Sequence, residues 1–220
     1  MENQRARGVR RRTRETVKVY EDACLLVFDK PSGLLSVPGL GPENQDNLAT
    51  RVQQHFPEAR NVHRLDRDTS GVIVMARSAE VHRELSRQFE HREVEKQYIA
   101  VVWGAVENDQ GLIDLPLGKD FDRPPRHRID HVHGKPAVTE WQVVERQDDR
   151  TRLLITPRTG RSHQIRVHLQ QIGHPVLGDN LYATERGRAM ADRLMLHAEM
   201  LSLSHPTTGE RMILQAKCPF

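Results

Sequence analysis

Residues 63–76 read HRLDRDTSGVIVMA, and this stretch decides how the rest of the chain is interpreted. Its last five residues form a short continuous apolar run, which is typical of a buried strand. The polar segment before it, residues 63–71, gathers His, Arg and two Asp side chains in one loop, and Thr-Ser-Gly turns that loop into the strand. Loops held on a rigid sheet are where reactive side chains tend to lie. Residues 63–71 are therefore the candidate active site.

The residues of this loop leave other interpretations open. One alternative is that Asp66 or Asp68 simply caps a turn, because aspartate side chains often bond to nearby backbone N–H groups. A metal site formed by His63, Asp66 and Asp68 is a further alternative. It is weaker, because this order is not a standard ligand spacing and no second ligand cluster follows it.

The pattern of apolar and polar runs predicts an α+β protein with a largely antiparallel or mixed sheet. Three pairs of short β-rich runs, each joined by a polar turn, predict hairpins. A helix is predicted over 79–92, where Val81, Leu85 and Phe89 share one face. Hairpins combined with a few amphipathic helices favour the α+β class. The expected hairpins are 16–28, 139–157 and 194–216, the helices 48–57, 79–92 and 161–173, a further strand 96–104, and the loops 34–47 and 118–136.

The composition fits one globular domain that is able to bind nucleic acid. The chain has 220 residues, a formal net charge of +3 and a pI near 9.1, which permits a nucleic-acid partner without requiring one. Cys24 and Cys218 lie far apart and indicate neither a zinc ribbon nor a redox motif, and Cys24 is expected to be a small buried hydrophobic residue. With no secretory signal and no apolar run of transmembrane length, we expect a cytoplasmic protein without a membrane partner. The Arg-rich residues 1–15 are expected to form a disordered tail, and residues 16–220 one catalytic domain.

A second polar motif, GRSHQIR at residues 160–166, opens the predicted helix 161–173. Ser162 is the expected N-cap, and His163 and Arg166 then lie in the first turns. A helix N-terminus with arginines nearby suits an anion, which is either an RNA phosphate or a carboxylate of the protein itself. A solvated cationic face is the alternative. No G-x-S-x-G motif is present, so a serine hydrolase is not indicated.

Several segments together resemble the pseudouridine synthases of the RluA family, and they are spread over almost the whole chain beyond the tail. The resemblance implies the pseudouridine-synthase fold, an α+β fold with a central mixed, largely antiparallel sheet flanked by helices and RNA-binding loops. It also implies an isomerase that needs no metal and no cofactor. The matching segments are KPSGLLSVPG (30–39), HRLDRDTSGVIVMA (63–76), KQYIAVVWG (96–104), GRSHQIRVHL (160–169), GHPVLGDNLYA (173–183) and LHAEMLSLSHP (196–206).

The resemblance also implies a role for particular residues. The family's nucleophilic aspartate falls on Asp66, and the aromatic residue that stacks on the target uracil and helps to deprotonate C5 falls on Tyr98. The basic residue that pairs with the nucleophile falls on Arg166. Base flipping costs roughly a few kcal/mol, and an arginine at Arg64 is suited to fill the gap left in the RNA. The residues expected to contact RNA are Arg64, His63, Arg161 and His163.

The resemblance further implies a substrate class and leaves alternatives within it. Similar enzymes act on a uridine in the anticodon arm of tRNA and on one in a loop of 23S rRNA, so both RNAs are expected partners of a monomeric enzyme. The 15 residues before the first hairpin are too few for the S4-type RNA-binding domain of longer family members. A synthase for only one RNA class, a catalytically idle RNA-binding protein or RNA chaperone, and a metal-dependent hydrolase are the competing interpretations. Whether Asp66 attacks C1′ or C6, or acts through a glycal, is left open.

Overall fold

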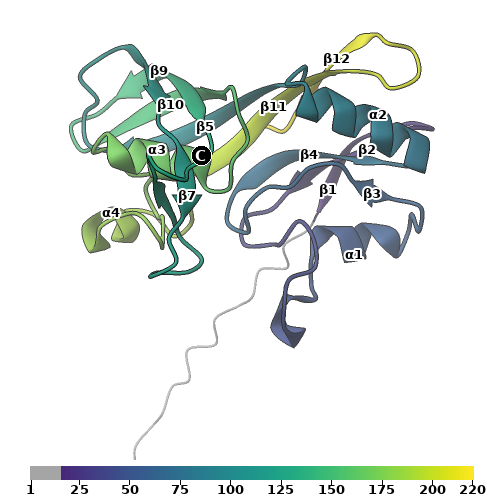
Figure 1. Cartoon of the computed structure of the whole chain (residues 1–220), viewed down its shortest axis with the longest axis horizontal. Helices are drawn as coiled ribbons and strands as arrows, with labels where there is room; N and C mark the ends of the chain where they lie inside the picture. The colour runs from purple at the N-terminus through teal and green to yellow at the C-terminus, as the bar shows by residue number, and fades with distance from the viewer. Residues whose placement is uncertain (1–15) are drawn as a thin grey trace, which may run out of the picture.

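The computed structural model describes residues 16–220, so the expected tail over 1–15 lies outside the described residues. Within the described part of the chain, a ten-stranded mixed sheet runs through two lobes, in the order β1-β2-β4-β11-β5-β10-β9-β6, with β3 paired to β4 and β12 to β11 (Figure 1). Only the β4–β11 pair in this sheet is parallel. The strands are β1 (Val17–Glu21), β2 (Leu25–Lys30), β3 (Arg60–Asn61), β4 (Ser70–Ala76), β5 (Glu95–Trp103), β6 (Gln110–Asp114), β9 (Val138–Arg146), β10 (Arg150–Pro157), β11 (Leu196–Ser204) and β12 (Arg211–Gln215). The helices are α1 (Leu48–Gln53), α2 (Ala79–Glu90), α3 (Gln164–Gln171) and α4 (Glu185–Ala189), with a 3-10 turn, η1 (Pro42–Asn44).

Strand β4 has both of its faces covered, which explains why its sequence is apolar without a break. Val72, Val74 and Ala76 pack on the side that α2 covers, in one cluster with the apolar face of that helix. Ile73 and Met75 point the other way and pack on the side that α1 covers. All seven residues of the strand are buried. The active-site loop is therefore attached to one of the most firmly packed strands of the protein.

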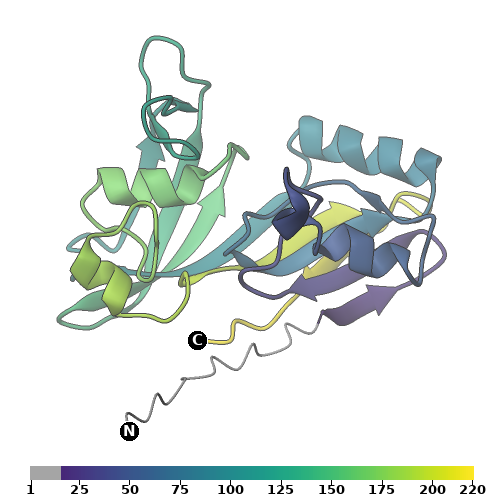
Figure 2. The same ribbon diagram turned by 90° about the horizontal axis from the view of Figure 1, so that it is seen from below.

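The second lobe is built from β5, β10, β9 and β6, with α3 packed on it (Figure 2). Ile165 and Leu169 of α3 lie in one cluster with Leu153 and Ile155 of β10. Strand β11 joins the lobes, because it pairs with β5 along one edge and with β4 and β12 along the other. The loop that precedes β4 and the N-terminal end of α3 thus face each other across the junction of the lobes.

The parallel contact between β4 and β11 requires a glycine. Gly71 pairs with Ala198 and has a φ of +117°, a conformation that other residues rarely adopt. A Cβ atom at this position would lie 2.1 Å from the carbonyl oxygen of Ala198. The Thr-Ser-Gly turn of the sequence motif is therefore also the point at which β4 packs directly against the backbone of β11.

Most of the predicted elements are confirmed. The three hairpins appear as β1–β2, β9–β10 and β11–β12, and the helices and the strand 96–104 lie where they were expected. Two predictions are wrong. The segment 118–136 is not a plain loop, because β7 (Leu117–Lys119) and β8 (His127–Ile129) form a small antiparallel sheet in it. The N-cap of α3 is His163 and not Ser162, and His163 has a left-handed backbone with no side-chain cap.

The close approach at Gly71 leads to a prediction about stability. Gly71→Ala should lower the free energy of unfolding by about 3 kcal/mol or more, because it adds a steric clash to an unfavourable φ. Gly209→Ala is the matched control, since Gly209 also has a positive φ of +74° but nothing within 4 Å of an added Cβ. We expect the control to lose only about 1 kcal/mol. Urea unfolding of both variants measures the difference, and equal losses would contradict the argument.

Candidate active site

A buried lysine holds the candidate active-site loop from one side. Lys30, at the end of β2, is fully buried, and its Nζ donates to the carbonyl oxygens of Pro31, Leu34 and Arg67 at 3.1, 2.7 and 3.0 Å. These three acceptors match the three N–H donors of an ammonium group. The backbone N–H of Gly33 donates to the same Arg67 carbonyl at 2.8 Å. The segment that begins with KPSG therefore fixes the backbone next to Asp66.

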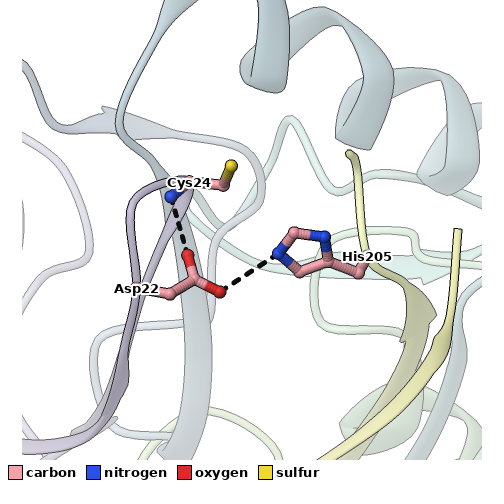
Figure 3. A group of neighbouring side chains, drawn as sticks. All are labelled: Asp22, Cys24 and His205. Atoms are coloured by element: carbon pink, nitrogen blue, oxygen red, sulfur yellow. Dashed lines mark hydrogen bonds and ion pairs between the residues drawn. The ribbon is translucent and has the colours of Figure 1, made fainter. Parts of the chain in front are cut away.

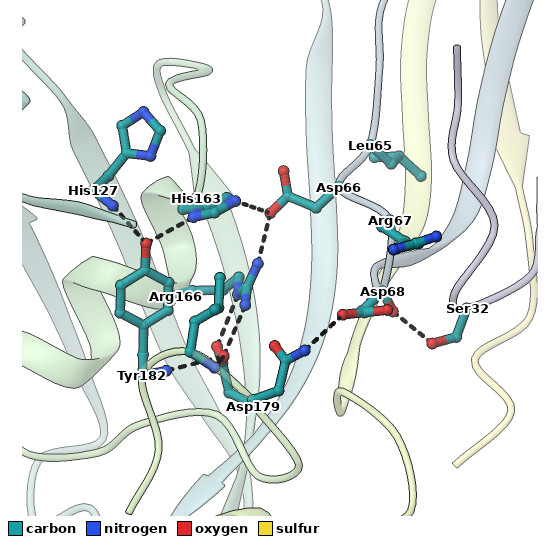
Figure 4. A network of polar contacts seen from close by, with 12 residues as sticks. Ser32, Leu65, Asp66, Arg67, Asp68, His127, His163, Arg166, Asp179 and Tyr182 are labelled. Atoms are coloured by element: carbon teal, nitrogen blue, oxygen red, sulfur yellow. Dashed lines mark hydrogen bonds and ion pairs between the residues drawn. The ribbon is translucent and has the colours of Figure 1, made fainter. Parts of the chain in front are cut away.

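Two serines of the same segment complete this support. The Ser36 hydroxyl donates to the carbonyl of Leu65 at 2.8 Å and accepts from the N–H of Leu65 at 3.0 Å. The Ser32 hydroxyl donates to the carbonyl of Asp68 at 2.7 Å. The backbone on both sides of Asp66 is thus bonded to residues 30–36, while the Asp66 side chain points away from them (Figure 4).

A chain of charges from the other lobe reaches the Asp66 carboxylate (Figure 4). Asp179 is fully buried and receives Nε and one terminal nitrogen of Arg166 at 2.8 and 2.7 Å. The remaining terminal nitrogen of Arg166 donates to Oδ2 of Asp66 at 3.2 Å. Burial opposes the charge of Arg166, but the bonds to Asp179 and the charge of Asp66 outweigh it and raise its pKa above the ordinary value. Arg166 is therefore a permanently charged donor held in one orientation.

Tyr98 enters the site from β5. Burial raises the pKa of Tyr98 above its ordinary value, and the charge of Asp66 adds to this effect. The hydroxyl is therefore protonated at neutral pH. Tyr98 lines the same cleft as Asp66, so one wall offers an aromatic ring and another a carboxylate.

The cleft has a volume of about 330 Å³ and brings together every residue that the sequence predicted for the site. This volume suits a small ligand or a single base. The predicted residues that line it are His63, Arg64, Asp66, Tyr98, Arg161, His163 and Arg166. Segments from both lobes contribute to it, so the site lies at the junction of the lobes.

The four residues expected to contact RNA differ in how free their polar groups are. Arg64 is exposed at the cleft, whereas Arg161 uses its Nε to donate to the Pro136 carbonyl at 3.2 Å. His163 has its Nε2 3.8 Å from Oδ2 of Asp66, and its pKa is lowered to about 4, chiefly by burial, although Asp66 opposes this. It is therefore a neutral imidazole at neutral pH.

His63 supports the loop with its ring. Its Nε2 accepts the backbone N–H of Val74 at 3.0 Å, and its ring stacks on Phe89 with centroids 4.7 Å apart. Burial, with a smaller effect of Lys96, lowers the pKa of His63 to about 3. The hydrogen bond needs an unprotonated Nε2, so the nitrogen that faces the protein is not available to RNA.

Among the described residues, one group has ligand atoms close enough together to bind a metal ion, and it lies outside the active-site loop. Asp22, Cys24 and His205 offer ligand atoms within 4.8 Å of one another (Figure 3). However, Nδ1 of His205 accepts the N–H groups of Thr207 and Thr208, so Nε2 carries the proton and donates to Asp22 at 3.1 Å. The group therefore ties two hairpin turns together. Cys24 packs against an apolar cluster as a hydrophobic residue does, but it is half-buried and lies 3.1 Å from the Thr207 hydroxyl, so the expectation of full burial is wrong.

The sequence did not single out several residues that organise the site. Asp179, Tyr182 and Lys30 lie in segments that matched the family pattern, but Asp179 and Tyr182 are single polar residues in an irregular stretch and Lys30 is one at the end of a strand. The one signal for Asp179 was its position in GHPVLGDNLYA, which gives no indication of a charge partner.

The comparisons with known proteins agree on one family. The profile of the RNA pseudouridylate synthase family matches residues 24–171. This chain belongs to that family. It is an enzyme that forms pseudouridine in RNA, so the predicted activity and the α+β pseudouridine-synthase fold are confirmed.

Curated relatives cover nearly the whole chain. The Dual-specificity RNA pseudouridine synthase RluA of Yersinia pestis is 51% identical over 93% of this chain and 100% of the relative. The protein of the same name from Escherichia coli (strain K12) is 51% identical over 93% of this chain and 94% of its own length. The solved structure of Human RNA Pseudouridylate Synthase Domain Containing 1 aligns with a TM-score of 0.80 at 30% identity, covering 94% of this chain and 85% of that one.

No helix in the part of the synthase that the structure describes is long and apolar enough to span a membrane.

The buried state of His63 leads to a prediction about pH. The folded-state pKa of His63 is about 3, below the ordinary value of 6.5. At a pH between these two values, His63 is therefore protonated in the unfolded chain and neutral in the folded chain. Its contribution to stability is therefore full above pH 6.5 and is lost as the pH falls toward 3. Because the ring also lines the open cleft, we expect a loss of only about 1 kcal/mol between pH 7.5 and 5.

His63→Gln should remove this part of the pH dependence, since a glutamine amide oxygen can accept the same N–H without titrating. His55→Gln, at an exposed position, is the control and should leave the dependence unchanged. Urea unfolding at pH 7.5 and pH 5 measures both variants. If His63→Gln loses as much stability as the wild type on acidification, the assignment of that dependence to His63 is incorrect.

Proposed function

We propose that this enzyme has dual specificity and isomerises a uridine in the anticodon arm of tRNA and one in a loop of 23S rRNA. The support is the identity of 51% over 93% of the chain to relatives that are named dual-specificity synthases. We further propose that it works as a monomer in the cytoplasm, with residues 16–220 as its catalytic domain.

Asp66 is the nucleophile in this proposal, and the observation that carries it is the chain from Asp179 through Arg166 to Asp66. The reaction breaks the N1–C1′ bond of uridine, turns the uracil and joins C5 to C1′ with loss of the C5 proton. Arg166 occupies Oδ2 of Asp66, while the other carboxylate oxygen has no hydrogen-bond partner among the described residues. The Asp66 side chain is 22% exposed and so remains reachable from the cleft. Arg166 on one oxygen fixes the orientation of the carboxylate and leaves the other oxygen as the attacking atom.

Tyr98 stacks on the uracil and receives the C5 proton at the end of the reaction. Its raised pKa means that the hydroxyl is protonated before substrate binds. A phenol can take up the C5 proton only while it gives its own proton to another base. The Asp66 carboxylate, which is free again once C5 has joined C1′ and lies in the same cleft, is that acceptor. Stacking needs no ionisation and operates from the moment of binding.

Arg64 fills the gap that the flipped uridine leaves in the RNA. It is the exposed arginine of the active-site loop that lines the cleft, and a planar guanidinium can stack where a base was. Arg161 and His163 then contact the backbone or the uracil edge from the opposite side of the cleft. His63 contributes indirectly, because its ring holds the loop against β4.

RNA recognition beyond the flipped base comes from the segments 34–47 and 118–136, one on each lobe (Figure 2). Each presents an exposed apolar side chain, Leu40 at 93% and Phe121 at 82%. Phe121 stands in a basic segment that also contains Arg123 and Arg128. An exposed aromatic residue among arginines suits an unpaired base that stacks while its phosphates bind the cations.

The assignment of Asp66 as the nucleophile predicts the effect of replacing its carboxylate by an amide. Asp66→Asn should lower tritium release from C5-labelled uridine more than about a thousandfold, because an amide cannot replace the attacking carboxylate. Binding of the RNA should change little. Asp68→Asn is the matched control two residues away. Among residues 16–220 its carboxylate accepts a hydrogen bond only from Asn180, at 3.5 Å, so the variant should keep activity within about threefold. Undiminished turnover by Asp66→Asn would remove the nucleophile assignment.

The same assay separates the alternative functions. Release from both tRNA and 23S rRNA transcripts supports dual specificity, and release from one alone limits the enzyme to that class. An RNA that the wild type binds without tritium release is not a substrate, and toward that RNA the enzyme acts only as a binding protein or chaperone. A chelator abolishes the activity if the enzyme is metal-dependent.

The recognition proposal predicts a separate effect at Phe121. Phe121→Ala should weaken RNA binding about tenfold, as expected for the loss of one stacked base, while the rate at saturating RNA stays the same. Phe121→Trp should retain affinity, and Val144→Ala removes an exposed apolar side chain outside the segment as a control. Filter binding with an anticodon stem-loop measures the affinities. Equal affinity of Phe121→Ala and the wild type would exclude stacking at this position.

A further inference from the structure

Tyr182 lies where the catalytic charges and the segment 118–136 meet, and nothing in the family pattern gives it a role. We propose that its hydroxyl is a positioning group that fixes the ring of His163 beside Asp66 and ties β8 to the active site. The inference rests on the proposed function of Asp66 and deepens it, because it specifies how RNA bound to segment 118–136 and the catalytic carboxylate are coupled.

The hydrogen bonds of the Tyr182 hydroxyl define the orientation of its proton (Figure 4). The oxygen accepts the backbone N–H of His127, the first residue of β8, at 2.8 Å. Among the described residues, Nδ1 of His163, 2.7 Å away, is the one acceptor that the Tyr182 hydroxyl contacts, so we assign the hydroxyl hydrogen to this bond. Because Nδ1 accepts, the single proton of the neutral imidazole is on Nε2. That N–H faces Oδ2 of Asp66, 3.8 Å away.

His163 depends on outside support for this position. It is a non-glycine residue with a φ of +57° at the N-cap of α3, and its side chain makes no capping bond. Such a conformation costs about 1 kcal/mol and persists when its surroundings hold it. The rings of Tyr182 and His127 provide that support, because they lie edge-on to the His163 ring with centroids 5.6 and 5.1 Å away.

Tyr182 is itself fixed by the catalytic charges. It is 6% exposed, and its backbone N–H donates to Oδ1 of Asp179 at 3.1 Å. The guanidinium groups of Arg166 and Arg126 each lie 5.1 Å from the centre of its ring. Arg126 adjoins β8, and Arg166 contacts Asp66. A shift of β8 on RNA binding therefore reaches Tyr182, then His163, and then Oδ2 of Asp66, the oxygen that Arg166 also contacts.

The bond from the Tyr182 hydroxyl keeps His163 in the neutral form with its proton on Nε2, and this N–H can act as a hydrogen-bond donor to Asp66 during the reaction. At 3.8 Å it is too far for a hydrogen bond in the free enzyme, but a small movement toward Asp66 would give the carboxylate a second donor. Two donors on Oδ2 would leave the other oxygen as the attacking atom. Without the Tyr182 hydroxyl, the imidazole loses the bond that sets its tautomer.

The test is Tyr182→Phe in the full-length enzyme, with C5-tritiated anticodon stem-loop as substrate. We expect the single-turnover rate at saturating RNA to fall about tenfold to a hundredfold, the range for a misplaced catalytic group, while the Kd changes less than about threefold. Tyr20→Phe is the matched control, because it also removes a tyrosine hydroxyl that donates at 2.7 Å, here to Asp22 outside the cleft. The control should react at the wild-type rate. A rate within threefold of wild type for Tyr182→Phe, or an effect on Kd alone, would overturn the proposal.

A spectroscopic measurement keeps the proposal testable even if Tyr182→Phe does not fold. The imidazole nitrogen-15 shifts of His163 should report the Nε2–H tautomer in the wild type and a mixture of tautomers in Tyr182→Phe. An Nδ1–H tautomer in the wild type contradicts the proposed bond from the Tyr182 hydroxyl to His163, whether or not the enzyme is active on this RNA. Absence of tritium release by the wild type would instead reject the proposed function.

Discussion

The active site depends on the buried ion pair between Arg166 and Asp179. Both side chains are at most 3% exposed, so each charge has lost its hydration and is compensated chiefly by the other through two short hydrogen bonds. Such pairs add little net stability, but removing one partner leaves an uncompensated buried charge. What the pair provides is orientation, because Asp179 holds two of the guanidinium nitrogens and leaves the third aimed at Asp66.

Asp66 is consequently positioned from two sides by different lobes. Residues 30–36 bond to the backbone around it, with Lys30 and Ser36 as the central contacts, and Arg166 reaches its carboxylate from α3. Neither set of contacts alone fixes both the loop and the side chain. The continuous sheet through β11 is what keeps the two lobes in register, so the geometry of the carboxylate follows from the architecture as a whole.

The sequence predicted the parts of this arrangement that leave a periodic or motif signal. The apolar run after residue 71 predicted β4, and the two polar motifs led to Asp66 and Arg166 on the strength of the family resemblance. Lys30, Asp179 and Tyr182 were not predicted, because a single polar residue at a strand end or in a loop has no pattern that reveals its burial or its partner. The prediction of Ser162 as the N-cap was wrong. The turn before α3 is instead held by the Gln164 side chain, whose oxygen accepts from the Thr159 hydroxyl and from the N–H of Arg161. His163 is the N-cap residue and has a left-handed backbone conformation.

The position of β11 has a consequence for the synthesis of the protein. This strand is made well after β4 and β5, yet it lies between them in the sheet. A nascent or truncated chain without it has two unpaired strand edges in the middle of its sheet, and such edges promote aggregation. In such a chain, the active-site residues of the two lobes also have no strand to hold them next to each other. Chains that lack β11 should therefore be inactive and prone to degradation, and we expect RNA modification to begin only after this strand has closed the sheet.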